Sequence, residues 1–420
     1  MITSRERLER VLLRKTADRI PVDMGATSVT GVHVRVVEQL RRATGLPYQP
    51  VKVIEPYQML GEVDEQLCDA LGIDVVGLWA RKTMFGFENQ SWREFRTFWG
   101  QVVLVPDGFQ TTLDQNGDLL IYPEGDRNAA PSGRMPKASF FFDTIVRQEP
   151  LDEAHLDPQD NLEEFAPYSQ EDLAHWSRAV ARYRQTSSRG LIGSIGGTAL
   201  GDIAMVPGPW MKRPRGVRDI AEWYMTLVAR PDYVHAIFEK QTEMALANLE
   251  AAHRVIGDAL QAVFLCGTDF GTQDSQFCSV DTFQELFLPY YRRMNDWIHR
   301  HTSWKVFKHS CGAVEPLIES FIEAGFDILN PVQVNAAGMD PRHLKERFGS
   351  RLVFWGGGVD TQKVLPFGTP EEVEAHVVRQ CEVLGRDGGF VFNTVHNIQA
   401  NVPVENVMAM VRGIRRANGS

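Results

Sequence analysis

The chain has 420 residues, of which 43% are hydrophobic and 23% are charged, and its formal net charge at pH 7 is -10. These values are ordinary for a globular protein with a large core, and the acidic balance argues against a nucleic-acid partner, which usually needs a basic face. No run approaches the ~18 apolar residues of a membrane helix, and the charged first residues show no targeting signal, so we expect a cytoplasmic protein without a membrane partner.

The first part of the sequence predicts a helical arm and then a β-rich segment. Residues 3–25 read as a capped helix followed by a strand that opens at Pro21. Between about residues 85 and 143 the pattern changes to strand-like alternation with turns, and Asn116-Gly117 is a hairpin signal. We expect this stretch to be a β-rich insertion within one domain that spans residues 1–420.

The second half alternates short apolar runs with amphipathic stretches of helical length, which is typical of βα units and a parallel sheet. The predicted strands lie within residues 259–271, 304–312, 326–333, 351–360 and 388–397, and the predicted helices lie within 313–325, 341–349, 370–385 and 403–417. Such a series closes into a (β/α)8 TIM barrel or stays open as a doubly wound sheet. We favour the barrel, because polar residues recur after many strands and no glycine-rich dinucleotide fingerprint is present.

The stretch "KHSCG" (308–312) holds a candidate metal-ligand pair at the end of a predicted strand. His309 and Cys311 flank one residue, and in an extended segment residues two apart point to the same side. Imidazole nitrogen and thiolate sulfur are ligands that zinc takes. A barrel builds its active site at the C-terminal ends of its strands, so this position strengthens the metal interpretation.

A metal site needs a third ligand, and His396 is the best candidate because it also follows a glycine-led apolar run. The alternative for His396 is a packed, hydrogen-bonded loop histidine. Asp269 lies past another strand end, where a carboxylate serves as ligand, acid, base or helix cap. Cys266, just before it, is better explained as a core residue of the strand.

Three segments carry a family resemblance. Residues 388–407, "GGFVFNTVHNIQANVPVENV", resemble the final strand and helix of the uroporphyrinogen decarboxylase superfamily, which contains porphyrin decarboxylases and cobalamin-linked methyltransferases. Residues 354–362, "FWGGGVDTQ", are similar to its preceding glycine and aspartate segment, and residues 18–25, "DRIPVDMG", to its first strand. The resemblance spans most of the chain.

The decarboxylase branch of the superfamily binds a tetrapyrrole through an arginine-bearing segment after the first strand. Here that place reads "VDMGATSVTGVH" (22–33), with no arginine before Arg35. The acidic side chains of four pyrroles would lose their main cationic anchor. The resemblance therefore argues against uroporphyrinogen as the substrate.

The methyltransferase branch uses zinc held by a His-x-Cys pair and a later cysteine, and the zinc activates a thiol that accepts a methyl group from a corrinoid. His309 and Cys311 match the pair, whereas the later cysteine falls at His396. Two nitrogens and one sulfur carry less negative charge than one nitrogen and two sulfurs. The metal would therefore be a stronger Lewis acid and its bound thiolate less nucleophilic, which weakens the expectation of a thiol substrate. Alternatively, His396 contacts the substrate, and Asp269 or water completes the metal site.

Four further residues follow predicted strands near these positions. Gln333, Asp360 and Asn393 are candidates for hydrogen bonding to a substrate or for orienting a ligand, with turn chemistry as the alternative. Trp355 is a candidate for an apolar wall or for facing a flat corrinoid ring, with core packing as the alternative.

We therefore expect a zinc-dependent methyltransferase that moves a methyl group between a corrinoid (cobalamin), expected on a separate protein, and a small-molecule acceptor or donor. In this hypothesis Asp269 and His396 are catalytic. One alternative is a decarboxylase or related lyase that acts on a small carboxylate or a tetrapyrrole-like substrate without an essential metal. Another is a non-catalytic corrinoid-binding protein. The sequence does not determine the oligomeric state, and a homodimer stays open.

Overall fold

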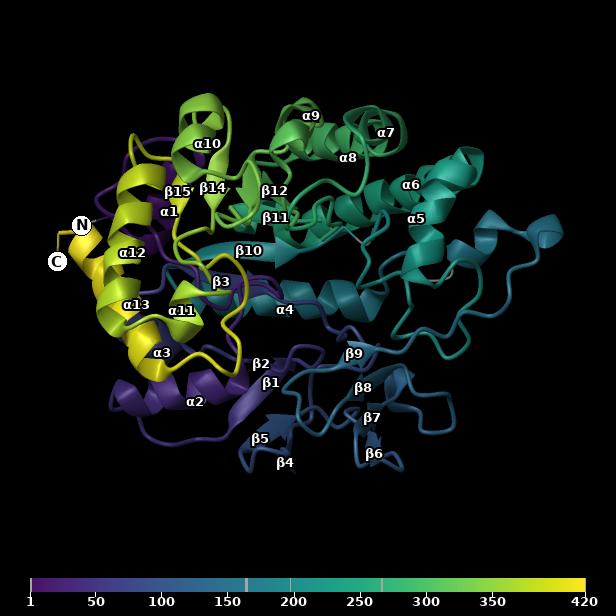
Figure 1. Ribbon diagram of the computed structural model, residues 1–420, viewed down its shortest axis with the longest axis horizontal. Coiled ribbons are helices and arrows are strands. Elements are labelled where there is room, and N and C mark those ends of the chain that lie inside the picture. The colour runs from purple at the N-terminus through teal and green to yellow at the C-terminus, as the bar shows by residue number, and fades with distance from the viewer. Residues whose placement is uncertain (1, 163–164, 197, 266, 420) are drawn as a thin grey trace.

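A curled sheet of seven parallel strands forms the centre of the protein. The computed structural model describes residues 2–162, 165–196, 198–265 and 267–419 (Figure 1). The strand order is β15-β14-β13-β12-β11-β10-β3. These strands are β3 (Val75–Leu78), β10 (Gly190–Ser194), β11 (Ala262–Phe264), β12 (Lys305–His309), β13 (Ile328–Asn330), β14 (Val353–Trp355) and β15 (Phe390–Val391).

Two single bridges join the edges of this sheet. Val22 pairs in parallel with Phe392, directly after β15, and Asp23 pairs in parallel with Val75 of β3. The strand predicted to open at Pro21 is thus reduced to two bridging residues. The (β/α)8 prediction is met in part: the protein is an α/β half-barrel of seven strands with these bridges between its edges.

Helices cover the outside of the sheet (Figure 1). The strands and helices predicted in the second half occur in the expected order, and three further helices at 280–286, 288–301 and 364–367 lie between them. Within the described ranges, no helix combines the length and the apolar character needed to cross a membrane. The helices that follow β3 are α4 (Gln170–Thr186), α5 (Ile220–Ala229), α6 (Pro231–Ile256), α7 (Val280–Leu286), α8 (Leu288–His301), α9 (Ile318–Glu323), α10 (Pro341–Phe348), α11 (Val364–Phe367), α12 (Pro370–Leu384) and α13 (Val404–Ala417).

The predicted helical arm is α1 (Ser4–Leu12), which closes the N-terminal end of the half-barrel. Thr3 and Glu6 form a reciprocal capping box that starts the helix. Its side chains Leu8, Val11 and Leu12 belong to the same buried cluster as the inward-facing residues of the strands. The arm is therefore part of the core.

A buried ionic cluster ties this arm to β3. The Asp74 side chain is 0% exposed and pairs with Arg7 at 2.8 Å and with Arg19 at 2.7 Å. Arg7 also pairs with Asp18 at 2.8 Å, and the Asp18 side chain is 40% exposed. Burial of Asp74 makes the arginine partners necessary, since an unpaired buried charge is costly.

The alternation of β12 separates the interior of the half-barrel from its helical shell. Phe307 packs in the interior cluster, whereas Lys308 lies against aromatic rings of the shell, 4.8 Å from the ring centre of Phe270 and 5.3 Å from that of Tyr291. Because successive side chains alternate, His309 returns to the inner side at the C-terminal end of the strand.

Two small sheets lie beside the half-barrel and, apart from β1 and β2, come between β3 and α4 in the chain (Figure 1). One has the order β2-β1-β5-β4 and the other the order β6-β7-β8-β9. The predicted Asn116-Gly117 hairpin turn is confirmed, with Gly117 at φ +81° between β6 and β7. The elements of this part are α2 (Val34–Ala43), β1 (Val51–Glu55), β2 (Leu60–Gly61), α3 (Glu65–Leu71), β4 (Arg93–Arg96), β5 (Val102–Val105), β6 (Thr111–Leu113), β7 (Leu119–Ile121), β8 (Gly133–Met135) and β9 (Asp143–Thr144).

Candidate metal centre

Three side chains capable of holding a metal meet at the C-terminal ends of β12 and β15. The ligand atoms of His309, Cys311 and His396 all lie within 4.8 Å of one another. The Sγ of Cys311 is 3.6 Å from Nε2 of His309, and the two imidazole centres are 5.7 Å apart. Among the residues that the structure describes, this is the one such group of three.

The imidazole of His309 is held in the orientation that a metal ligand needs. Its Nδ1 lies 2.6 Å from Oδ1 of Asn330, its register partner on β13. The Nδ2 of Asn330 donates to the Trp355 carbonyl at 2.8 Å, so its Oδ1 is an acceptor and His309 must donate from Nδ1. The lone pair of Nε2 is therefore free to bind a metal, on the side of the ring that faces Cys311.

The donor set and one measured separation fit zinc. Zinc bonds of ~2.1 Å to nitrogen and ~2.3 Å to sulfur at a tetrahedral angle place those two atoms about 3.6 Å apart. The separation between Nε2 of His309 and Sγ of Cys311 is 3.6 Å. Two imidazoles and one thiolate would leave a fourth position for a small molecule, as catalytic zinc sites do.

Asp269 lies directly beside the three ligand candidates. Its Oδ1 accepts a hydrogen bond from the Cys311 backbone N–H at 2.7 Å and is 3.7 Å from Nε2 of His309. Burial raises the pKa of its carboxyl, and the hydrogen bond from the Cys311 N–H opposes that rise. The carboxyl therefore holds the cysteine loop in place and is positioned to keep or take a proton.

The protonation states of the three candidates follow from burial. Burial lowers the pKa of His309 to about 4. Burial also lowers the pKa of His396, and the neighbouring His309 lowers it further. The pKa of the Cys311 thiol is raised by burial and by the charges of Asp269 and Asp202. At neutral pH both imidazoles are thus neutral and ready to ligate, whereas the thiol must release a proton to bind a cation.

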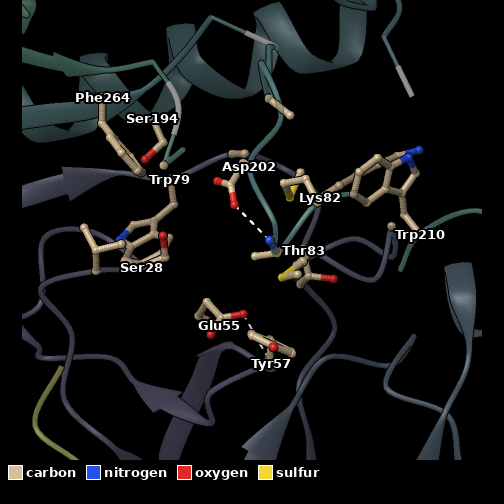
Figure 2. A pocket seen from close by; sticks show the side chains of 18 of the residues that line it. Ser28, Glu55, Tyr57, Trp79, Lys82, Thr83, Ser194, Asp202, Trp210 and Phe264 are labelled. Atoms are coloured by element: carbon tan, nitrogen blue, oxygen red, sulfur yellow. Dashed lines mark hydrogen bonds between the residues drawn. The ribbon is translucent and has the colours of Figure 1, made fainter. Parts of the chain in front are cut away.

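Beside these residues is a cavity of about 780 Å³, lined by His309, His396 and Asp269 at one end. Its other walls come from the end of β1, from the loop after β3 and from the segment after β10. Figure 2 shows Phe264 and Ser194 on one side of this cavity and Glu55 with Tyr57 on the other. The cavity therefore separates the mouth of the half-barrel from the β1 sheet.

Two of the predicted substrate-binding residues shape the loops around the metal candidates. Gln333 accepts a hydrogen bond from the Gly312 backbone N–H at 2.7 Å, which supports the turn after Cys311. Asp360 accepts a hydrogen bond from the Gln362 N–H at 2.7 Å, so its side chain stabilises a turn. Neither side chain is among those that line the cavity.

The other two, Trp355 and Asn393, lie inside the protein. Trp355 is 0% exposed, packs in the interior cluster and donates from Nε1 to Oδ2 of Asp23 at 2.9 Å. Asn393 is 1% exposed and donates to the Asp23 carbonyl at 3.1 Å. The structure brings neither to the cavity, and core packing accounts for Trp355.

Sequence reasoning missed two carboxylates of the cavity wall, Glu55 and Asp202. Glu55 ends β1, which lies outside the half-barrel, and Asp202 lies in a segment without regular periodicity after β10. No local signal in the sequence separates them from the other acidic residues. Cys266, which the sequence suggested as a core residue, lies outside the described residues.

Comparison with known proteins identifies the family. Residues 145–417 match the family described as Uroporphyrinogen decarboxylase (URO-D), and the chain belongs to this family. It is 27% identical over 216 residues to the uroporphyrinogen decarboxylase of Methylobacillus flagellatus, covering 49% of this chain and 56% of that protein. It is 24% identical over 269 residues to that of Magnetococcus marinus, covering 62% and 66% respectively. The chain thus spans roughly half to two thirds of these curated relatives.

A solved structure resembles the chain over its whole length. A methyltransferase from Methanosarcina mazei superposes with a TM-score of 0.54 at 14% identity, covering 99% of both chains. At this identity the likeness concerns the fold. The aligned region extends beyond residues 145–417, the part that matches the family.

Proposed function

We propose that this protein is a zinc-dependent methyltransferase that moves a methyl group between a corrinoid, carried on a partner protein, and a small molecule in the cavity. The observation that carries this proposal is the convergence of His309, Cys311 and His396 within 4.8 Å at the edge of that cavity. The fold shared with a methyltransferase supports it.

Each residue of the site has a distinct task in this proposal. A bound zinc ion would polarise the oxygen or sulfur that carries the methyl group. His309 and Cys311 hold the metal, Asn330 keeps Nε2 of His309 free for it, and His396 completes the ligand set. Asp269 supplies or removes the proton of the small molecule as the bond to its methyl group breaks or forms.

The cavity supports this reaction over the decarboxylation of a polyacidic substrate. The segment expected to carry a tetrapyrrole-binding arginine contributes Ser28 and Val29 to the wall. Arg81 also lines the cavity, but it already pairs with Asp172 at 2.8 Å and with Glu88. Glu55 adds a carboxyl to the wall rather than a cation, and burial raises its pKa to about 7, so a substrate bearing several carboxylates would meet a partly ionised carboxyl there.

Elemental analysis of the full chain purified without added metal tests the proposal. We expect about one zinc per chain, lost in His309→Ala and in Cys311→Ser, because removal of either ligand leaves too few donors. Cys278→Ser is the matched control, since Cys278 is a half-buried free cysteine outside the group of three. A folded wild-type chain without stoichiometric metal would overturn the zinc mechanism. Loss of metal in Cys278→Ser would show that the assignment to these ligands is wrong.

A further inference from the structure

Two carboxyl groups that line the cavity form no ion pair in the described part of the chain, although the charge of Lys308 acts on Asp202. Glu55 is 7% exposed, and its oxygens accept hydrogen bonds from the backbone N–H groups of Tyr57 and Gln58, both at 2.9 Å. Asp202 accepts from the Ala204 N–H at 2.9 Å. Figure 2 shows Asp202 on one side of the cavity and Glu55 with Tyr57 on the other.

The positive side chains of the wall do not neutralise these two groups. Arg81 is engaged by Glu88 and Asp172. Lys82 is exposed to solvent and forms no ion pair with either carboxylate in the described part of the chain. Because ionised carboxylates in an enclosed site are costly, burial raises the pKa of Glu55 to about 7 and that of Asp202 to about 6, and a ligand that brings positive charge would stabilise their ionised forms.

The remaining walls suit an organic cation. They include seven aromatic residues, and the face of an aromatic ring attracts a cation through its quadrupole, most strongly when water is excluded. The same faces disfavour an anion. The aromatic residues of the wall are Tyr57, Trp79, Phe165, Tyr168, Trp176, Trp210 and Phe264.

Two unpartnered polar atoms give an independent indication of a ligand. Thr198 lines the cavity, is 7% exposed, and its buried hydroxyl has no hydrogen-bond partner among the residues that the structure describes. Asn89 also lines the cavity, and its Nδ2 donates to the Ile54 carbonyl at 2.7 Å, so the unpartnered atom is the acceptor Oδ1. A buried acceptor without a donor is expected where a ligand supplies the N–H or O–H.

We propose that the small molecule bound in this cavity is an organic ammonium ion, held between Glu55 and Asp202 against the aromatic walls. The identity of the group that is methylated or demethylated rests on the proposed function, whereas recognition of the cation rests on the cavity alone. Glu55 and Asp202 are therefore specificity-determining residues, separate from the three metal-ligand candidates.

Titration calorimetry on the full chain tests this proposal with a charged ligand and its neutral isostere. The probes are choline, 3,3-dimethylbutan-1-ol, which has the same shape without the charge, and two further cations, tetramethylammonium and ethanolamine. We expect at least one of the three cations to bind. We expect 3,3-dimethylbutan-1-ol to bind at least tenfold more weakly than choline, or not at all.

Variants locate the binding to the two carboxylates. Glu55→Gln and Asp202→Asn should each weaken cation binding by about tenfold or more, while circular dichroism shows an unchanged fold. Glu124→Gln is the matched control, because Glu124 also lines the cavity but already pairs with Lys212 at 3.1 Å. Its affinity for the cation should stay at the wild-type value.

Three outcomes would overturn the inference: no cation of the panel binds, the neutral isostere binds as tightly as choline, or both carboxylate variants bind the cation unchanged. Cys311→Ser separates this inference from the proposed function. If that variant and the wild type hold no metal yet bind the cation, the methyltransferase proposal fails and the ammonium site stands. If the wild type holds metal that Cys311→Ser loses, and neither protein binds a cation of the panel, the ammonium site fails and the methyltransferase proposal stands.

Discussion

Asn330 accepts a hydrogen bond from Nδ1 of His309 at 2.6 Å, and the two residues lie opposite each other in the register of β12 and β13. The same amide donates to the Trp355 carbonyl on β14 at 2.8 Å. One side chain thus connects three neighbouring strands and determines which imidazole nitrogen is free. The tautomer of His309 is set by the sheet itself.

We expect Asn330→Ala to reduce zinc affinity by about 10- to 100-fold, because outer-shell hydrogen bonds orient a ligating imidazole and raise its basicity. A competition titration with a zinc indicator measures this change. Asn406→Ala is the control, since Asn406 is also a buried asparagine with two backbone acceptors, on Leu365 and Gly368, but lies on α13. Equal losses of zinc affinity in the two variants would rule out a specific role for Asn330.

The buried carboxyl of Asp23 should make the free energy of unfolding fall as pH rises. Its side chain is 1% exposed, and burial raises the pKa of its carboxyl to about 7 despite hydrogen bonds from Trp355 and Ala26. The unfolded chain releases this proton near pH 4, so unfolding is increasingly favoured from there up to about pH 7. The loss from this one group amounts to about 4 kcal/mol at most, since each pKa unit corresponds to about 1.4 kcal/mol.

Asp23→Asn should remove this dependence, because the amide stays neutral at every pH. Urea unfolding at pH 5 and pH 8 measures it: the gain in stability of the variant over the wild type should be larger at pH 8 than at pH 5, by about 3 kcal/mol at most, because two of the three pKa units lie between pH 5 and pH 7. A constant difference between the two proteins at both pH values would show that Asp23 does not titrate as described.

Gly312 should tolerate no side chain. It has φ +89°, and a Cβ there would lie 2.3 Å from the backbone carbonyl carbon of Gly271. We expect Gly312→Ala to cost about 3 kcal/mol or more and to release metal, because the turn after Cys311 must move away from the loop that carries Asp269. Thermal unfolding and elemental analysis measure both effects.

Gly72→Ala separates the strain of the backbone angle from the crowding. Gly72 ends α3 in the left-handed region at φ +74°, and a Cβ added there would have nothing within 4 Å. Its cost should be about 1 kcal/mol, with metal content unchanged. Similar costs for both glycines would mean that the close approach of Gly312 to Gly271 is not limiting.

Asp74 should matter far more than its neighbour in the ionic cluster. Asp74→Asn leaves the side chain of Arg7, which is 7% exposed, with a weaker partner and should cost about 3 kcal/mol in urea unfolding. Asp18→Asn removes a partner that is 40% exposed and should cost less than about 1 kcal/mol. If Asp18→Asn lost more stability than Asp74→Asn, the exposed pair of Arg7 and Asp18 would be the one that anchors α1.

Helices α10 and α12 of the second half could be predicted closely because each has its own boundary signals. α12 (Pro370–Leu384) begins after a Thr369 cap with proline at its first position, and it ends before Gly385. The first half gave fewer such signals. β3 pairs with β10, although the segment that forms most of the two small sheets separates them in the sequence. Pairing between such distant segments leaves no local trace in the sequence.

The candidate site likewise has residues that a local pattern predicts and residues that it does not. His309 and Cys311 were placed together by strand alternation, a local property, and their convergence with His396 is observed. Glu55 could not be predicted, because it reaches the cavity from a strand outside the half-barrel. Trp355 is of a residue type common in binding sites, but its place inside the sheet follows from packing that periodicity does not describe.

The position of α1 has a consequence for the order in which the molecule assembles. Leu8 and Val11 complete a core whose other side chains include Val391 of β15, near the opposite end of the sequence. Contacts of such sequence separation form slowly, because a long loop must close before they are gained. The contacts between α1 and β15 are therefore expected to form late in folding, and until then part of the apolar face of the helix stays uncovered.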